Sequence, residues 1–187
     1  MRVISGSAKG AKLIAPEGLE TRPTSDRIKE SLFNMISFDL YDAKFLDLFS
    51  GSGGIGIEAL SRGAKQAVFV DSSKEAYQCI KNNLNKTRFL EKSLVLNTTI
   101  EQALTELGSL SKQFDIIFMD PPYNKDMIDS TINLIVKNSL LSQEGYIIVE
   151  RASSHITLDY NNLKVWKEKK YKTTTMSFLK GTKVKWE

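Results

Sequence analysis

Short apolar segments alternate with longer amphipathic segments between Lys44 and Arg151, and this alternation restricts the folds that the chain can adopt. Strands are expected at 45–49, 66–71, 93–98, 114–120 and 145–150. Between these strands, apolar residues recur at helical spacing and predict helices. Strands this apolar are usually covered by helices on both faces, as in a parallel sheet. The sequence therefore predicts an α/β fold with a mostly parallel sheet.

The two ends of the chain follow different patterns. After Arg151 the helical spacing stops, and segments 163–171 and 174–184 predict an antiparallel strand pair at the C-terminus. Near the N-terminus, segment 3–14 predicts a small hairpin, which a helix starting near Asp26 follows.

The length and composition narrow the function classes. A chain of 187 residues fits a single domain, and we expect an extension at 1–40 and a core at 41–187. No segment approaches the roughly 18 uninterrupted apolar residues that span a bilayer. One cysteine and one histidine exclude an internal disulfide and leave little to bind a metal. We expect a cytoplasmic monomer without a metal site and without a membrane partner.

A glycine-rich turn follows the first predicted strand and opens a helix. Gly51, Gly53 and Gly56 match the pattern G-x-G-x-x-G in the strand-turn-helix context that this motif requires. Without side chains, the backbone allows a ligand to approach the carboxyl ends of the strands. Asp71 ends the second strand, where its carboxylate can accept hydrogen bonds from both hydroxyls of a ribose. The pattern predicts a nucleoside-containing cofactor, which Ser72 is also expected to contact.

Asp47 favours one cofactor over another. A carboxylate beside the glycine turn suits the ammonium of an amino acid, whereas it would repel a pyrophosphate. S-adenosylmethionine is therefore favoured over a dinucleotide. Thr99 and Ile100, after the third strand, are candidates to flank the adenine, although a helix cap and a core residue explain them equally well.

The tetrapeptide Asp120-Pro121-Pro122-Tyr123 follows the fourth strand and carries the chemistry. Two prolines cannot continue a ladder, and they stiffen the turn that positions the Asp120 carboxylate and the Pro121 carbonyl. These acceptors would bind the N–H groups of an amino group, directing its lone pair at a methyl donor. We expect Asp120 to contact the cofactor as well and to have an ordinary pKa near 4, and we expect Tyr123 to stack on a planar substrate. The sequence predicts methyl transfer to an amino nitrogen.

Basic residues gather at both ends of the chain. Residues 164–187 contain eight lysines and two glutamates, a local charge of +6, and the first sixteen residues contain three cations and no acid. This distribution favours a polyanionic partner, although lysines that only promote solubility explain it equally well. The candidate RNA contacts are Arg2, Lys9, Lys12, Arg27, Lys170 and Lys172, together with Tyr123.

Several segments together resemble one family, the RsmD-type 16S ribosomal RNA methyltransferases. The resemblance rests on segments 1–6, 22–34, 45–53, 56–63 and 120–123. The glycine turn and the proline turn occur in many methyltransferases, whereas 22–34 narrows the choice to this family.

The resemblance implies a class I (Rossmann-like) methyltransferase fold that binds S-adenosylmethionine and methylates N2 of a guanine in 16S rRNA of the assembling small ribosomal subunit. It implies that Arg22 and Thr24 bind the carboxylate of the cofactor. The chain departs from the family at Lys172, where many members carry glycine. How the C-terminal lysines meet RNA is therefore open.

Other functions compete with this interpretation. A DNA methyltransferase acting on adenine or cytosine amino groups can carry the same tetrapeptide, but it usually needs a sizeable region for base flipping. A glutamine methyltransferase usually has asparagine in place of Asp120. A nicotinamide-dependent oxidoreductase and a non-catalytic RNA-binding module also remain open.

Overall fold

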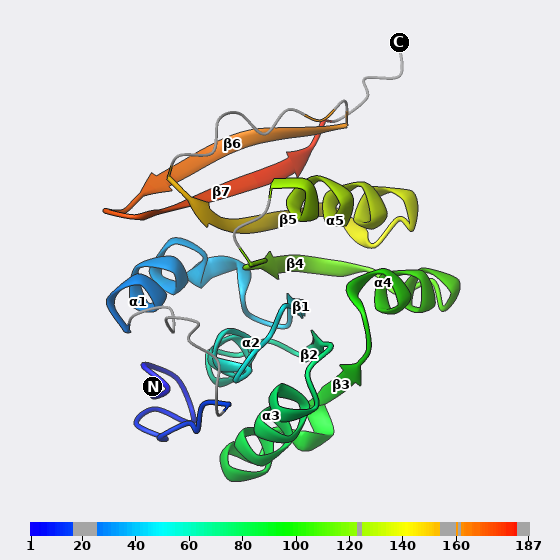
Figure 1. Ribbon diagram of the computed structural model, residues 1–187. Helices are drawn as coiled ribbons and strands as arrows, with labels where there is room; N and C mark the ends of the chain where they lie inside the picture. Colours follow the sequence, from blue (N-terminus) through cyan, green and yellow to red (C-terminus); the bar gives the residue numbers. More distant parts are fainter. Residues whose placement is uncertain (17–25, 123–124, 154–159, 161, 183–187) are drawn as a thin grey trace. The chain divides into compact units, whose positions relative to one another are not determined.

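The computed structural model describes residues 1–16, 26–122, 125–153, 160 and 162–182. The chain divides into two compact units, Met1–Ala103 and Leu104–Glu187, which are described separately (Figure 1). The predicted single domain, with an extension at 1–40 and a core at 41–187, stays a prediction.

The first unit contains three parallel strands in the order β3-β2-β1. Their bounds are β1 Lys44–Leu48, β2 Gln66–Asp71 and β3 Ser93–Asn97. β1 and β2 pair in register from Lys44 opposite Gln66 to Leu48 opposite Val70. The middle of β2 is buried throughout, as expected for a parallel strand covered on both faces.

The helical elements of this unit are α-helices where the sequence predicts helices, together with two 3-10 turns that it does not predict. They are α1 Asp26–Met35, the 3-10 turns η1 Ser37–Asp39 and η2 Leu90–Lys92, α2 Gly54–Ser61 and α3 Lys74–Thr87. α4, Ile100–Ser109, begins here and continues into the second unit. Ser73 caps α3 by accepting a hydrogen bond from the Ala76 N–H. Within the described residues, no helix is both long enough and apolar enough to cross a membrane.

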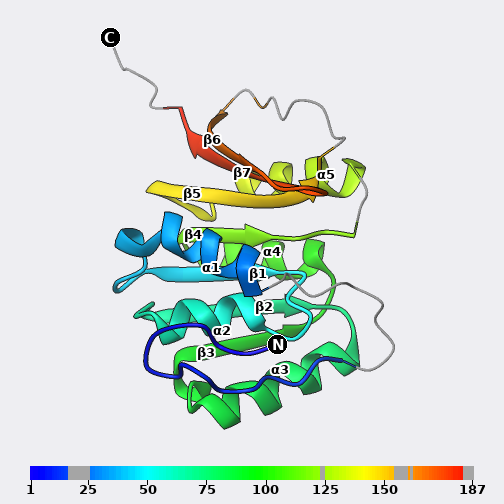
Figure 2. The same cartoon turned by 90° about the vertical axis from the view of Figure 1, so that its left-hand side faces the viewer.

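Residues 1–14, called the N-terminal hairpin below, confirm the predicted hairpin. Arg2 and Lys12 form an antiparallel bridge, and the Leu13 N–H donates to the Met1 carbonyl at 3.0 Å. Val3 and Leu13 are buried. The hairpin runs over α2 and α3 (Figure 2).

The second unit contains four strands in the order β4-β5-β7-β6. Its elements are β4 Phe114–Met119, α5 Lys125–Lys137, β5 Leu141–Ala152, β6 Leu163–Lys170 and β7 Thr174–Gly181. β4 and β5 are parallel, whereas β7 pairs antiparallel with both β5 and β6. The prediction of an α/β fold with a C-terminal antiparallel strand pair is confirmed.

β5 is longer than the segment 145–150 predicted from the sequence. It begins at Leu141, which pairs with Phe114, and the register shifts before Ile116. Gly145 lies at this irregularity, where a Cβ would come within 2.9 Å of the Phe114 carbonyl oxygen. The polar residues before Gly145 resemble a turn in sequence, but pairing with β4 makes them part of the strand.

Gly56 is expected to tolerate no side chain, because a Cβ there would lie 2.3 Å from Cε1 of the buried Phe69 ring. We expect Gly56→Ala to lower the free energy of unfolding by about 1–3 kcal/mol, the usual cost of overpacking a core. Denaturant titration would measure this loss. Gly181→Ala is the control, since a Cβ at Gly181 meets nothing within 4 Å. Equal stability of the two variants would contradict the prediction.

Candidate functional site

The glycine turn in the first unit links β1 to α2 through backbone that L-residues seldom adopt. Gly51 has φ 54° and Gly53 has φ 74°, both in the left-handed region where glycine is favoured. Ser50 holds the turn between two strands, because its hydroxyl donates to the Asp47 carbonyl at 2.6 Å and accepts from the Val70 N–H at 3.0 Å. The turn therefore has a defined position before any ligand binds.

The Asp71 carboxylate is fixed in orientation by two backbone donors. Its Oδ2 accepts from the Gly51 N–H at 2.8 Å, and its Oδ1 accepts from the Ser73 N–H at 3.0 Å. A carboxylate has about four lone-pair sites, so each oxygen can accept another hydrogen bond. A pair of vicinal hydroxyls, as in a ribose, is a chemically suitable partner.

The Asp47 carboxylate lies at the N-terminal end of α2, where helix electrostatics favour a negative charge. Only 2% of Asp47 is exposed, and Oδ2 accepts from the Gly56 N–H at 2.9 Å. This bond aligns β1 with the helix. Binding of an ammonium by Asp47 stays a prediction.

The remaining predicted cofactor residues of this unit lie after β2 and β3. Ser72 is exposed, and Thr99 Oγ1 accepts from the Gln102 N–H at 3.3 Å, so Thr99 also caps α4. Ile100 is half-buried at the first position of α4. Contacts of these residues with an adenine stay predictions.

In the second unit, Asp120 and Pro121 follow β4 directly. Met119, the last residue of β4, pairs with Val149 of β5, and Asp120 is half-buried beyond this pair. Pro121 is buried, which fits the rigid turn expected from two consecutive prolines.

The prediction of an ordinary pKa for Asp120 was wrong. Burial raises the pKa of its carboxyl group to about 6, because removal from water disfavours the charged form. At neutral pH the carboxylate is still the major form. It can therefore accept hydrogen bonds from N–H groups at pH 7, but its charge is lost at mildly acidic pH.

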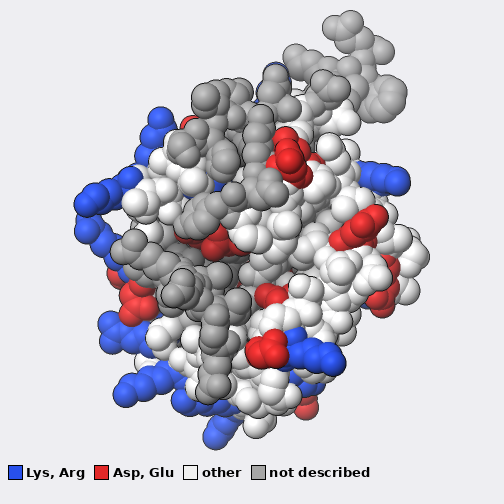
Figure 3. Space-filling model, in the orientation of Figure 1, with Lys and Arg blue, Asp and Glu red and all other residues white. Residues whose placement is uncertain are grey.

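The predicted RNA contacts lie on the surfaces of both units. Lys9 and Lys12 are exposed on the N-terminal hairpin, and Figure 3 shows Lys and Arg side chains projecting at the lower left, over this segment. Arg2 is also exposed but forms an ion pair with Asp26 at 3.1 Å.

Three further predicted contacts are exposed elsewhere. Arg27 lies on α1 and lines an open hollow of about 430 Å³ with Glu30, Ser31, Asn34 and Met35. In the second unit, Lys170 ends β6, and Lys172 lies in the turn before β7. Binding of RNA by these residues stays a prediction.

Three predicted site residues lie outside the described part of the chain. They are Arg22, Thr24 and Tyr123. Their roles stay predictions.

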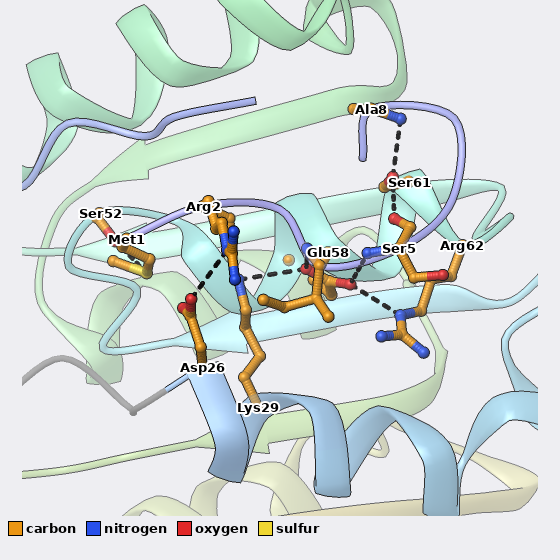
Figure 4. Close-up of polar contacts among 12 residues, drawn as sticks. Met1, Arg2, Ser5, Ala8, Asp26, Lys29, Ser52, Glu58, Ser61 and Arg62 are labelled. Atoms are coloured by element: carbon orange, nitrogen blue, oxygen red, sulfur yellow. Dashed lines mark hydrogen bonds and ion pairs between the residues drawn. The ribbon is translucent and has the colours of Figure 1, made fainter. Parts of the chain in front are cut away.

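A buried ion cluster around Glu58 was not predicted from the sequence. Glu58 and Lys29 are fully buried, with Lys29 Nζ 3.2 Å from Glu58 Oε2, and the Arg62 Nε–H donates to Glu58 Oε1 at 2.8 Å (Figure 4). The backbone N–H groups of Ile4 and Ser5 donate to the same carboxylate at 2.8 and 2.9 Å. Burial lowers the pKa of Lys29, and the nearby Glu58 opposes this shift.

The sequence contains a signal for this cluster. Lys29 lies on the face of α1 that also carries the buried Leu32 and Phe33, and Glu58 stands in α2, where every residue is buried. Charged residues are almost never fully buried unless they are paired. One unmatched cation and one unmatched carboxylate on buried faces therefore indicate a pair, although the sequence does not place the two helices together.

Comparison with known proteins identifies the family. A family model described as "Conserved hypothetical protein 95" matches residues 1–180. Ribosomal RNA small subunit methyltransferase D of Escherichia coli (strain K12) is 37% identical over 150 residues, which cover 80% of this chain and 74% of that protein. The chain belongs to the RsmD family.

Two further proteins resemble this RsmD family member closely. YlbH of Bacillus subtilis (strain 168) is 43% identical over 150 residues, which cover 80% of this chain and 82% of that protein. The solved structure of Escherichia coli yhhF, described provisionally as a methyltransferase, has a TM-score of 0.86 and 32% identity over 97% of each chain. The predicted class I methyltransferase fold is confirmed.

Replacement of Glu58 by glutamine is expected to destabilise the protein. Gln has one acceptor oxygen for four donors, and the variant leaves the Lys29 ammonium buried without its carboxylate. We expect the free energy of unfolding to fall by about 3–5 kcal/mol, as when one partner of a buried ion pair is removed. Denaturant titration would measure the change.

Two further variants test the assignment to the buried pair. Lys29→Met combined with Glu58→Gln should recover part of the lost stability, because the fully buried ammonium is then removed together with its carboxylate. Asp42→Asn is the control, since it breaks the exposed Lys65–Asp42 pair, and it should cost about 1 kcal/mol or less. Equal losses in Glu58→Gln and Asp42→Asn would contradict the prediction.

Proposed function

We propose that this S-adenosylmethionine-dependent rRNA methyltransferase modifies the N2 amino group of a guanine in 16S rRNA of the small ribosomal subunit. The observation that carries the proposal is the half-buried Asp120, held by a proline turn at the end of β4 in a member of the RsmD family. The rRNA methyltransferase names of relatives support the class of substrate, and the choice of N2 rests on the family resemblance.

The residues around the glycine turn fit the proposed cofactor. Two N–H groups hold the Asp71 carboxylate in one orientation, which suits a pair of ribose hydroxyls, and the buried Asp47 carboxylate suits an ammonium. Gly51 leaves the backbone open to close approach, because a Cβ there would meet nothing within 4 Å. Arg22 and Thr24 are proposed to bind the carboxylate of the amino acid. When bound, this cofactor supplies an electrophilic methyl group on a sulfonium.

Asp120 and Pro121 are proposed to hold the reacting amino group. The N2 amino nitrogen of guanine is a weak nucleophile, because its lone pair is delocalised into the ring. Hydrogen bonds from its two N–H groups to the Asp120 carboxylate and the Pro121 carbonyl would favour a tetrahedral nitrogen. The lone pair would then point at the methyl group for in-line attack at roughly 3 Å. After attack, the acidic N–H proton of the product is readily lost.

The basic surfaces are proposed to bind the RNA backbone. Lys9 and Lys12 on the N-terminal hairpin and Lys170 and Lys172 near the β6–β7 turn are exposed cations suited to phosphate contacts. Arg2 and Arg27 are proposed to bind phosphates together with Lys9 and Lys12, and Tyr123 is proposed to stack on the target base. A substrate in the assembling small subunit would be met in the cytoplasm. Action as a monomer stays a prediction.

Methyl transfer from labelled S-adenosylmethionine to small subunits that lack the modification tests the proposal. We expect wild-type protein to label one guanine of 16S rRNA, and we expect Asp120→Ala to reduce kcat by at least about 100-fold, as for loss of a transition-state hydrogen-bonding group. Cofactor affinity, measured by calorimetry, should change little. Glu144→Ala, which removes an exposed carboxylate on β5, is the matched control. Labelling of duplex DNA without labelling of subunits would contradict the proposed substrate.

The pH dependence of the rate should follow the raised pKa of Asp120. The carboxylate form accepts the N–H bonds, so kcat should be constant above about pH 7 and should fall about tenfold per pH unit below the pKa of about 6. Single-turnover rates at saturating cofactor would measure this profile. Cofactor affinity over the same pH range is the control. A rate that falls only near pH 4 would show that burial does not shift this carboxyl group.

A further inference from the structure

The carboxylate of Glu58 binds the N-terminal hairpin through its backbone. Oε2 accepts from the Ile4 N–H and Oε1 from the Ser5 N–H, at 2.8 and 2.9 Å. Lys29 links the same carboxylate to the first residues of the hairpin, because its ammonium also donates to the Arg2 carbonyl at 2.5 Å. Backbone contacts of this kind fix the path of the hairpin whatever its exposed side chains are.

Ser61, one turn after Glu58 on α2, extends this attachment. Its hydroxyl donates to the Ser5 carbonyl at 2.6 Å and accepts from the Ala8 N–H at 2.9 Å. Gly6 passes so close to α2 that a Cβ on it would lie 1.8 Å from the Ser61 carbonyl oxygen. The tip of the hairpin is therefore pressed against the end of α2.

The far end of the hairpin is attached to α3. Asn83, with 1% exposed surface, accepts from the Ile14 N–H through Oδ1 and donates to the Ile14 carbonyl through Nδ2, both at 2.9 Å. The same Nδ2 donates to the Ser52 carbonyl in the glycine turn at 2.9 Å. The buried Asn83 amide thus connects the hairpin, α3 and the glycine turn.

Stability alone does not explain this arrangement. A buried ion pair is often no more stabilising than apolar residues of similar volume. Among its described residues, the hairpin buries only two hydrophobic side chains, Val3 and Leu13. Its backbone nevertheless binds a buried carboxylate that has four hydrogen-bond donors in all. This number of directional hydrogen bonds specifies the position of the hairpin on α2. The helix α2 itself starts at Gly54 in the glycine turn.

We propose that Glu58 is a positioning residue for the RNA substrate. Its carboxylate sets where the N-terminal hairpin lies on α2, and therefore where Lys9 and Lys12 meet RNA phosphates relative to the glycine turn. Ser61 assists by holding the hairpin tip. This inference rests on the proposed function and assigns to Glu58 an effect on RNA binding without contact with RNA or cofactor.

Kinetics of Glu58→Gln and Ser61→Ala on small subunits that lack the modification would test the proposal. We expect the KM for subunits to rise about tenfold, because misplaced lysines lose phosphate contacts. The dependence of KM on salt should become weaker for the same reason. kcat at saturating subunits and cofactor affinity by calorimetry should stay within about twofold. Ser61→Ala leaves the buried charges in place, so it tests the proposal even where Glu58→Gln fails to fold.

The matched control is Thr87→Val, which removes a buried hydroxyl that donates to the Asn83 carbonyl inside α3 at 2.7 Å. It should lower stability without a change in KM or in salt dependence. An unchanged KM in Ser61→Ala and in folded Glu58→Gln, with normal wild-type methylation, would overturn the inference alone. An equal rise in KM in Ser61→Ala and in Thr87→Val, compared at matched stability, would also overturn it. Absence of RNA methylation by the wild-type protein would overturn the proposed function instead.

Discussion

Parallel pairing of β1 with β2 determines the geometry of the candidate cofactor site. Because Leu48 pairs with Val70, the chain leaves β1 beside the end of β2, and Ser50 bonds to backbone groups of both strands. In the same register, Asp71 reaches the Gly51 N–H. A slip by one residue would turn the buried side chains of a strand to the opposite face. Burial of the strands therefore keeps the turn and its carboxylate together.

Carboxylates in this protein serve three purposes that their surroundings determine. Glu58 is fully buried and has four donors, so its charge holds elements together. Asp71 has two donors and retains acceptor sites for a ligand. Asp120 is half-buried, and burial raises its pKa, so its charge is lost at a higher pH than the charge of an ordinary carboxyl group. The same chemical group thus has a structural, a proposed binding and a proposed catalytic use.

The N-terminal hairpin is too small to be held by apolar burial, and polar contacts replace a core. Its backbone groups bond to Glu58, Ser61 and Asn83, which belong to the two helices that follow β1 and β2. These helices also support the glycine turn. A surface proposed to bind RNA is therefore attached to the elements proposed to hold the cofactor. This attachment explains why both surfaces lie in one compact unit of this RsmD family member.

The sequence by itself determined the elements that depend on local patterns. The strands, the helices, the glycine turn and the C-terminal strand pair follow from apolar periodicity and turn chemistry, and resemblance led from the segment 22–34 to the family. Tertiary structure decided what depends on residues far apart in the chain. Lys29 and Glu58 form a pair only because α1 and α2 pack together, and β5 extends to Leu141 only because β4 pairs with it. The pKa of Asp120 is likewise a property of burial, which no local pattern specifies, since solvation depends on all the atoms that surround a group.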